Sequence, residues 1–592
     1  AGKENAAGKT LAALDEVFGV GGKKEESQKL PETMKRLTPL EEEKVRLLEA
    51  KAGKALFEIN IRLLSSAPTE ERAKAILQGL TFAFAQYNDP NLNRFEPKEV
   101  SAHALRRLVF QFSFRIFDPT KKMICSTEEL TSIFHFPNIS LETPKIKILK
   151  AREAAAPPNL PHEGLLLGYN LFRDQTSDIY MLDQDRQRHL YIVGQTGTGK
   201  TAFLKNMIVQ DIEQGRGVCF IDPHGDTAEE ILGLIPRYRN QDVIYFDPGD
   251  VERPLGLNFL EYDPNFPEQK TFIVNELFSI FEKLYGAVPE ALGPIFQQYF
   301  RNATMLVMDD PSSGNTLLEI GRVLAEKSFR DLKIAHAKNI VIRNFWTEVA
   351  EKAGSDAELR NLVPYITSKI DTFTANDIMR PIIAQEKSAF NFREIMDNSK
   401  ILLVNLSKGR LGDINSSLIG LIIVGKLTMA ALSRADMLQE RRRDFYLYID
   451  EFQNVTTDSV ATILSEARKY RLNLIVAHQF IKQLHDNIRN AVFGNVGSLV
   501  SFRVGSEDGE FLEKQFVPVF KSQDLINLDN YNCYVKLLIN GATTIPFSMK
   551  TYPPQKGELQ VAEIVKEISR AKYGRARDEV EKEILDRHQR PL

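Results

Sequence analysis

The stretch Gly194-Gln-Thr-Gly-Thr-Gly199-Lys200-Thr201 is a complete G-x-x-x-x-G-K-[ST] phosphate-binding loop. The residues on either side fit such a loop. The apolar run at 189–193 predicts a short strand, and residues 201–214 have helical spacing of apolar side chains. In a strand–loop–helix arrangement, backbone N–H groups and the positive end of the helix dipole attract phosphates. The sequence therefore predicts a nucleotide site whose contacts come from Gly194, Gln195, Thr196, Gly197, Thr198, Gly199, Lys200 and Thr201.

A second motif supplies the acidic half of an ATP site. Residues 445–449 form an apolar strand-like run that ends in Asp450 and Glu451. We expect Asp450 and the Thr201 hydroxyl to hold Mg²⁺, Lys200 to reach the β- and γ-phosphates, and Glu451 to polarise the attacking water. ATP and Mg²⁺ are thus the predicted cofactors, and ATP hydrolysis is the predicted reaction. The alternative is a pair of carboxylates that end a strand and are solvated by water.

Further polar residues end or precede neighbouring predicted strands. Gln479 follows the run 472–477 and is a candidate sensor of the γ-phosphate. Arg468 precedes that run and is a candidate arginine finger for a neighbouring subunit, or else a surface arginine favoured by the helix dipole. Asp222 ends the run 218–222 and is a candidate for the water or Mg²⁺ shell, whereas His224 is equally explained as a turn residue. No other cluster has zinc spacing, so Mg²⁺ is the metal expected.

The composition narrows the class of protein. The chain has 592 residues, 43% of them hydrophobic and 26% charged, with a formal net charge of −3. Contact with nucleic acid would therefore need a local basic surface. Three cysteines match no disulfide framework, which favours a reducing compartment. The most apolar stretch, 418–432, is interrupted by Lys426 and predicts a buried core helix. The first residue is Ala1, so we expect a truncated or processed product, and whether a membrane anchor preceded it stays open on sequence alone.

The order of patterns along the chain predicts its domains. We expect a flexible linker at 1–40, a small α+β domain at 41–153, an ATPase core at 160–264 and 391–554, an all-helical insertion at 265–390 and a charged, solvated helical tail at 555–592. Seven short apolar runs predict a parallel sheet buried on both faces; they are 190–193, 218–222, 243–247, 401–406, 445–450, 472–477 and 499–504.

Turn and strand signals are also clear outside these runs. Strands are expected at 57–63 and 108–117, and the capping box Ser126-x-x-Glu129 predicts the start of a short helix. A hairpin is expected at 164–182. A second hairpin is expected at Asn540-Gly541, which is a type I′ turn signal.

In combination and order, the motifs resemble the HerA/FtsK superfamily of ring-shaped pumping ATPases. The resemblance rests on 194–201, Ile221-Asp-Pro-His-Gly-Asp226, Tyr448-Ile-Asp-Glu-Phe452 and Ala467-Arg-Lys-Tyr-Arg-Leu-Asn-Leu474 with Ala477-His-Gln479. Within the superfamily the chain is most similar to the conjugative DNA-transfer coupling proteins of type IV secretion, with pilus-associated secretion ATPases as close relatives. Residues 57–137 are similar to the amino-terminal module of the latter. The resemblance covers roughly residues 160–550.

The resemblance implies an α/β fold, with a RecA-like P-loop NTPase core, an inserted helical subdomain and a small α+β amino-terminal domain. It also implies a homo-hexamer with ATP between subunits and DNA, single- or double-stranded, threaded through the ring. Arg468, eighteen residues after Asp450 and eleven before Gln479, stands at the family's finger position. Arg503 is the second candidate.

The implied partners are DNA, a membrane-embedded secretion apparatus, and a relaxase or protein cargo. The implied location is the cytoplasm, at the inner face of the membrane through an upstream anchor or a partner. Lys408 and Arg410 are the first candidates for contacts with the DNA backbone, and Arg441-Arg-Arg443 is another, although it is also explained as a solvated flank.

Two other functions stay open on sequence alone. One is a secretion ATPase with the same active site that exports protein or pilin instead of DNA. The other is a nucleotide-binding docking module that recruits cargo without processive motion. The paired Asp450-Glu451 argues against a docking module, because a static binder needs no carboxylate that polarises water.

Overall fold

The computed structural model describes residues 37–90, 92–100, 102–135, 151–286, 292–350 and 356–590. The chain divides into two compact units, Ala1–Lys147 and Ile148–Leu592, which are described separately below.

The first unit combines short helices with one pair of strands. Its elements are α2 (Pro39–Ala52), β1 (Leu56–Ile59), α3 (Glu70–Ala83), α4 (Ala102–Ser113), β2 (Met123–Ser126) and α5 (Thr127–Ile133). Strand β1 pairs antiparallel with β2. The predicted capping box is confirmed, because the Ser126 N–H donates to Glu129 Oε2 at 2.7 Å and the Glu129 N–H donates to Ser126 Oγ at 3.4 Å.

The strand predicted at 108–117 is wrong, because residues 102–113 form helix α4. The helix begins in the stretch Ala-His-Ala-Leu-Arg-Arg, whose alanines, leucine and arginines are strong helix formers. Once a first turn exists, each further residue adds a hydrogen bond, and no glycine or proline interrupts the helix before Asp118-Pro119. The alternation of Phe110, Phe112 and Phe114 was therefore a misleading signal.

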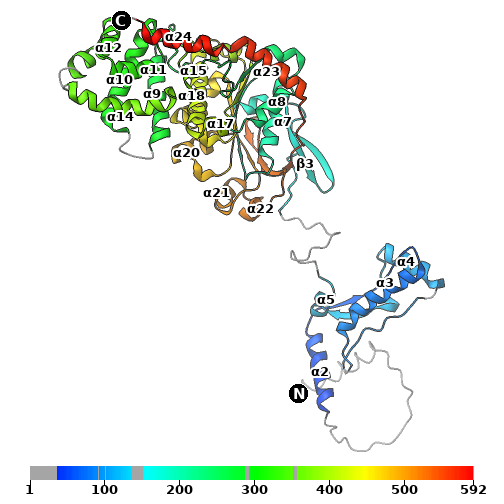
Figure 1. Cartoon of the computed structure of the whole chain (residues 1–592). Coiled ribbons are helices and arrows are strands. Elements are labelled where there is room, and N and C mark those ends of the chain that lie inside the picture. The colour runs from blue at the N-terminus through cyan, green and yellow to red at the C-terminus, as the bar shows by residue number, and fades with distance from the viewer. Residues whose placement is uncertain are drawn as a thin grey trace, which may run out of the picture. The chain divides into compact units, whose positions relative to one another are not determined.

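The second unit is built on one mixed sheet with α/β architecture (Figure 1). Among the described residues, eleven strands lie in the order β4-β3-β15-β12-β11-β5-β10-β9-β6-β8-β7. Strands β11, β5, β10, β9, β6, β8 and β7 are parallel, and the others add to the β11 edge in antiparallel fashion. Their bounds are β3 (Leu165–Phe172), β4 (Gln175–Met181), β5 (Leu190–Val193), β6 (Gly217–Asp222), β7 (Val243–Phe246), β8 (Ile401–Asn405), β9 (Phe445–Ile449), β10 (Leu472–His478), β11 (Ser498–Ser501), β12 (Asn532–Lys536) and β15 (Phe547–Lys550).

All seven predicted core strands and both hairpins are confirmed. The parallel strands are buried on both faces, which explains why they are continuously apolar. The second hairpin joins β13 (Leu538–Ile539) to β14 (Ala542–Thr543), and Asn540 and Gly541 have φ values of 52° and 77°, as a type I′ turn requires.

Helices cover both faces of the sheet. On one face, α7 (Lys200–Glu213), α8 (Asp226–Leu232) and α23 (Leu559–Tyr573) pack on alternate residues of the strands. On the other face lie α18 (Asp413–Ser433), α19 (Asp458–Glu466), α20 (Asp486–Asn495) and α21 (Ser506–Phe516). Shorter helices complete the core, namely α6 (Asp183–Arg186), α17 (Lys408–Leu411) and α22 (Ser522–Ile526).

A helical region is inserted between β7 and β8, and Figure 1 shows it as a group of helices on one side of the sheet. The described residues between these strands contain no strand. Trp346 is fully buried in this region. Its helices are α9 (Gln269–Tyr285), α10 (Pro294–Asp309), α11 (Leu317–Ala325), α12 (Lys327–His336), α13 (Ile340–Asn344), α14 (Asp356–Thr374), α15 (Arg380–Ile383) and α16 (Phe392–Asp397).

Helix α18 is the apolar helix expected in the core. In the described part of the chain, Asp413–Asp436 is the one helical stretch long and apolar enough to cross a membrane, but 78% of its most apolar window is buried inside the protein. Lys426 is buried in it and its Nζ donates to the Glu261 carbonyl oxygen. Burial lowers the pKa of Lys426 to about 7, although the Glu261 carboxylate opposes this shift.

This buried lysine predicts a pH-dependent stability. Above pH 7 the folded chain holds Lys426 neutral, whereas the unfolded chain keeps its proton up to the ordinary lysine pKa, so raising the pH stabilises the fold. We expect the gain in unfolding free energy from Lys426→Met to shrink by about 2 kcal/mol between about pH 7.5 and about pH 9. Chemical unfolding of both proteins at the two pH values measures it, and a difference independent of pH would contradict a neutral buried lysine.

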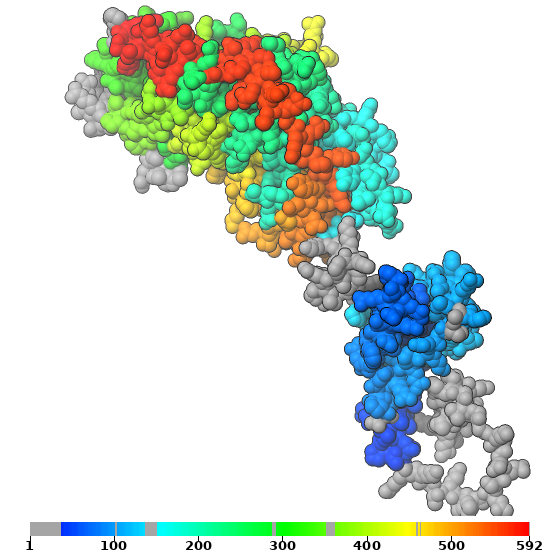
Figure 2. All heavy atoms as spheres, turned by 45° about the vertical axis from the view of Figure 1, so that its right-hand side comes forward, coloured from blue at the N-terminus to red at the C-terminus, as the bar shows by residue number. Residues whose placement is uncertain are grey.

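The carboxyl-terminal segment is helical as predicted, but it is not a solvated tail. Helix α23 buries Val565 against α8 and β7. Helix α24 (Arg577–Gln589) buries Val580, and its Arg587 donates to Glu319 Oε1 at 3.0 Å and to the Ala384 carbonyl oxygen at 2.7 Å. Figure 2 shows both helices lying along the surface of the second unit. The high charge of the segment predicted solvation. Its Arg587 is nevertheless buried, because it pairs with Glu319 inside the protein.

Candidate nucleotide site

The phosphate loop joins β5 to α7, and Thr196 and Gly197 lie exposed at its tip. Gly199 precedes the helix with φ 113°, a conformation that L side chains rarely adopt. Lys200 is buried and its Nζ donates to the carbonyl oxygens of Gly194 and Gln195 at 2.5 and 3.0 Å. Burial lowers the pKa of Lys200, and the carboxylates of Asp450 and Glu451 oppose this shift.

The acidic motif meets the loop because β9 and β5 flank β10 in the parallel sheet, which brings their carboxyl ends to one edge. Thr201 Oγ1 donates to Asp450 Oδ2 at 3.0 Å, and the Glu451 N–H donates to Asp450 Oδ1 at 2.9 Å. Burial and the neighbouring Glu451 raise the pKa of Asp450 to about 6. A cation beside this carboxylate would offset its burial.

The residues present fit Mg²⁺. This ion is usually held by one or two carboxylates together with substrate phosphates and waters, and Asp450 with the Thr201 hydroxyl supplies such a pair of oxygens. The described residues contain no group of three or more histidines, cysteines or carboxylates placed to hold a metal ion alone. A metal at this site would therefore share its coordination with a bound phosphate.

Glu451 is held by two glutamine side chains. Its Oε1 accepts from Gln479 Nε2 at 2.5 Å and its Oε2 accepts from Gln453 Nε2 at 2.7 Å. Its backbone lies in the left-handed region, with φ 50°. Gln479 is a predicted site residue, whereas Gln453, which follows Glu451 by two residues on the 3₁₀ turn Phe452–Val455, is not. The two-residue spacing between Glu451 and Gln453 was the one sequence signal that could have revealed Gln453.

The structure separates the two candidate arginines. Arg468 is exposed on the turn Ala467–Tyr470 before β10, at the edge of the sheet opposite to the phosphate loop. Within the described residues its side chain has no ion-pair partner. Arg503 follows β11 and donates to Gln195 Oε1 at 3.4 Å and to the Leu528 carbonyl oxygen at 3.2 Å. Arg503 thus contacts the loop of its own chain, which Arg468 does not.

Asp222 and His224 belong to the turn that starts α8. Asp222 accepts from the N–H groups of His224 and Ala228 at 2.9 and 3.0 Å, so both carboxylate oxygens satisfy backbone donors. The His224 side chain is exposed. These contacts favour the turn interpretation for His224 and give Asp222 a structural role.

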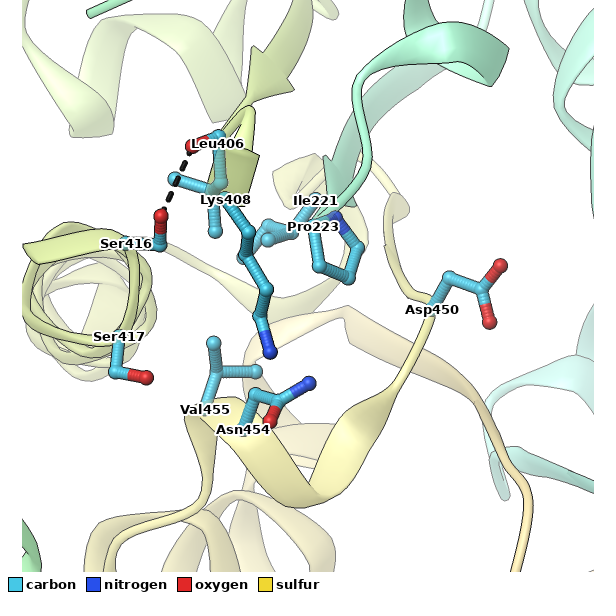
Figure 3. Close-up of a pocket in the computed structure, with 9 residues that line it drawn as sticks. All are labelled: Ile221, Pro223, Leu406, Lys408, Ser416, Ser417, Asp450, Asn454 and Val455. Carbon is cyan, nitrogen blue, oxygen red and sulfur yellow. Dashed lines mark hydrogen bonds between the residues drawn. The ribbon is translucent and has the colours of Figure 1, made fainter. Parts of the chain in front are cut away.

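The basic residues expected to contact DNA lie in two different places. Lys408 lines a small pocket with Asp450 and Asn454, and Figure 3 shows its side chain extending towards Asn454. Its Nζ lies 3.5 Å from Asp413 Oδ1. Arg410 approaches the backbone of Gly249. The guanidinium of Arg442 donates to the backbone carbonyl oxygens of Lys469 and Met437. Its neighbours Arg441 and Arg443 are exposed.

One family model covers the segment that bears the phosphate loop. Residues 170–304 match the family model described as the central domain of helicase HerA. Residues 21–148 match a domain of unknown function, DUF8128. A search of curated proteins finds no match.

Several solved structures are also similar to this chain. The bacterial conjugative coupling protein TrwBdeltaN70 is 18% identical with a TM-score of 0.48, over 64% of this chain and 90% of that chain. The plasmid coupling protein TrwB in complex with ADP and Mg²⁺ is 17% identical with a TM-score of 0.48, over 65% and 90%. VirB4 of Thermoanaerobacter pseudethanolicus is 15% identical with a TM-score of 0.45, over 67% and 98%.

The superfamily predicted from the motifs is the one that the family model identifies. The match spans β5, the phosphate loop and α7, which together form the phosphate-binding half of the site. The segment 170–304 therefore matches the central domain of helicase HerA and carries the phosphate-binding loop.

Proposed function

We propose that this chain is an ATP-driven DNA translocase, the coupling ATPase of a type IV secretion or conjugation system. It hydrolyses ATP at the subunit interfaces of a homo-hexameric ring and moves DNA through the centre. It acts in the cytoplasm at the inner face of the membrane, beside a membrane-embedded secretion apparatus, and a relaxase or protein cargo is a further partner. The observation that carries the proposal is the convergence of Lys200, Thr201, Asp450, Glu451 and Gln479 at one sheet edge.

Each of these side chains has a distinct chemical task. Lys200, which donates to the loop carbonyls, would reach the β- and γ-phosphates of a bound nucleotide. Thr201 and Asp450 would hold Mg²⁺, which would supply positive charge to the phosphates. Glu451 orients the attacking water and accepts its proton. Gln479 donates to Glu451, so it links the position of that carboxylate to the γ-phosphate.

The position of Arg468 supports the proposed hexameric ring, in which neighbouring subunits share each ATP site. A finger residue must reach the transferring phosphoryl group, and Arg468 lies at the opposite sheet edge from its own phosphate loop. An exposed arginine placed in this way can complete only the site of a neighbouring subunit. The DNA assignment rests on the superfamily resemblance and on the matched domain, which is described as part of a helicase.

ATP hydrolysis with and without DNA tests the proposal. We expect single- or double-stranded DNA to stimulate hydrolysis strongly, with Glu451→Gln as the blank, and the more effective strand form to be the one that the ring grips. Hydrolysis that depends on Glu451 but not on DNA would favour the export of protein or pilin instead. ATP binding without hydrolysis above the blank would favour a docking module.

A further inference from the structure

An aromatic side chain from a distant part of the chain stands beside the phosphate loop. A Cβ atom on Gly199 would lie 2.9 Å from Tyr531 Cδ1 and 3.4 Å from Tyr531 Cε1, so the ring packs against the backbone where α7 begins. Tyr531 is 49% exposed. One part of the ring therefore contacts the loop and another part faces solvent.

The backbone of Tyr531 is fixed in an unusual conformation. Its φ of 62° lies in the left-handed region, which is uncommon for a bulky residue. The Tyr531 N–H donates to the Thr198 carbonyl oxygen at 2.8 Å, and its own carbonyl oxygen accepts from the Thr551 N–H at 3.0 Å. Strained residues of this kind occur at ligand clamps and persist because their surroundings hold them.

The position of the ring matches the part of a nucleotide that the loop leaves uncovered. Loop N–H groups cradle the phosphates, and Lys200 reaches the β- and γ-phosphates. The ribose and base must then leave the loop past the first turn of α7, where Tyr531 stands. Tyr531 brings no positive charge to the phosphates, and its hydroxyl forms no hydrogen bond with the described residues. The exposed part of the ring is available for stacking.

On this geometry, and resting on the proposed ATPase function, we propose that Tyr531 is the platform on which the purine base of the nucleotide stacks. The contact is apolar and uses the ring face, so it binds the base without reading its hydrogen-bonding edge. Tyr531 is thus a binding residue for the base, separate from the residues that hold the phosphates and polarise water.

Titration calorimetry in the Glu451→Gln background tests this role, with Mg²⁺-ATP and Mg²⁺-tripolyphosphate as probes. We expect Tyr531→Ala and Tyr531→Leu to weaken ATP binding about tenfold or more, the usual size of a base–aromatic contact, and to leave tripolyphosphate binding unchanged. Tyr531→Phe retains the ring and should bind ATP like the parent. The matched control is Tyr238→Ala, because Tyr238 is an exposed tyrosine that contacts the other end of α7 through the Glu213 carbonyl oxygen.

The two probes separate stacking from mere support of the loop. Equal losses for ATP and tripolyphosphate would overturn the platform, because they would mean that the ring only props the phosphate loop. Unchanged ATP affinity in Tyr531→Ala would also overturn it. Lys200→Ala distinguishes this failure from failure of the proposed function: it should abolish binding of both probes, and if it leaves ATP binding intact the nucleotide site itself is wrong.

Discussion

Replacing Glu451 with glutamine is expected to lower the rate of ATP hydrolysis at least about 100-fold while ATP still binds. The glutamine has one acceptor oxygen where Glu451 has two, and it has lost the negative charge that polarises water. It therefore keeps at most one of the hydrogen bonds from Gln479 and Gln453 and cannot accept a proton from water. The measurement is single-turnover hydrolysis together with direct nucleotide binding.

Glu440→Gln is the matched control, because Glu440 is an exposed glutamate on the turn Gln439–Arg441. It should hydrolyse ATP like the parent protein. If Glu451→Gln keeps its hydrolysis rate, Glu451 does not polarise the water. If it loses ATP binding as well, the carboxylate has a structural role at the site instead of a catalytic one.

Replacing Arg468 with alanine is expected to lower hydrolysis about 10³-fold or more in the assembled ring, as loss of an arginine finger does. The structure makes this test specific, because Arg468 and Lys200 of one chain lie at opposite edges of the sheet. In a mixture of Arg468→Ala and Lys200→Ala subunits, an intact loop meets an intact finger at some interfaces. Random mixing should restore roughly a quarter of the parent activity if neighbouring sites act independently.

Arg503→Ala is the control for this experiment. Arg503 contacts Gln195 in its own chain, so if Arg503→Ala alone lowers hydrolysis, its mixture with Lys200→Ala leaves each site with a defect and should show no recovery. Recovery with Arg503→Ala but not with Arg468→Ala would reverse the assignment of the finger. No recovery in either mixture would contradict a finger supplied by a neighbouring subunit.

Most of the catalytic edge follows from the order of local motifs. The phosphate loop, the acidic pair and Gln479 each follow an apolar run, and parallel strands place their carboxyl ends together. Strand length and β-branched or aromatic composition were enough to locate these runs. Secondary structure outside the sheet was less secure, as α4 shows, because the strong helix formers at its start outweigh the alternation of a few phenylalanines.

What the sequence by itself determined is the chemistry that depends on neighbouring residues: glycines where the loop needs them, Lys200 and Thr201 at the start of a helix, and two carboxylates at the end of a strand. Only the tertiary structure decided which distant residues meet them. Tyr531 reaches Gly199 from more than 300 positions away, and Arg587 of the charged carboxyl-terminal segment pairs with Glu319 inside the protein. The physical reason is that a local pattern specifies the conformation and exposure of a segment, whereas contacts between remote segments depend on how the whole sheet and its helices pack.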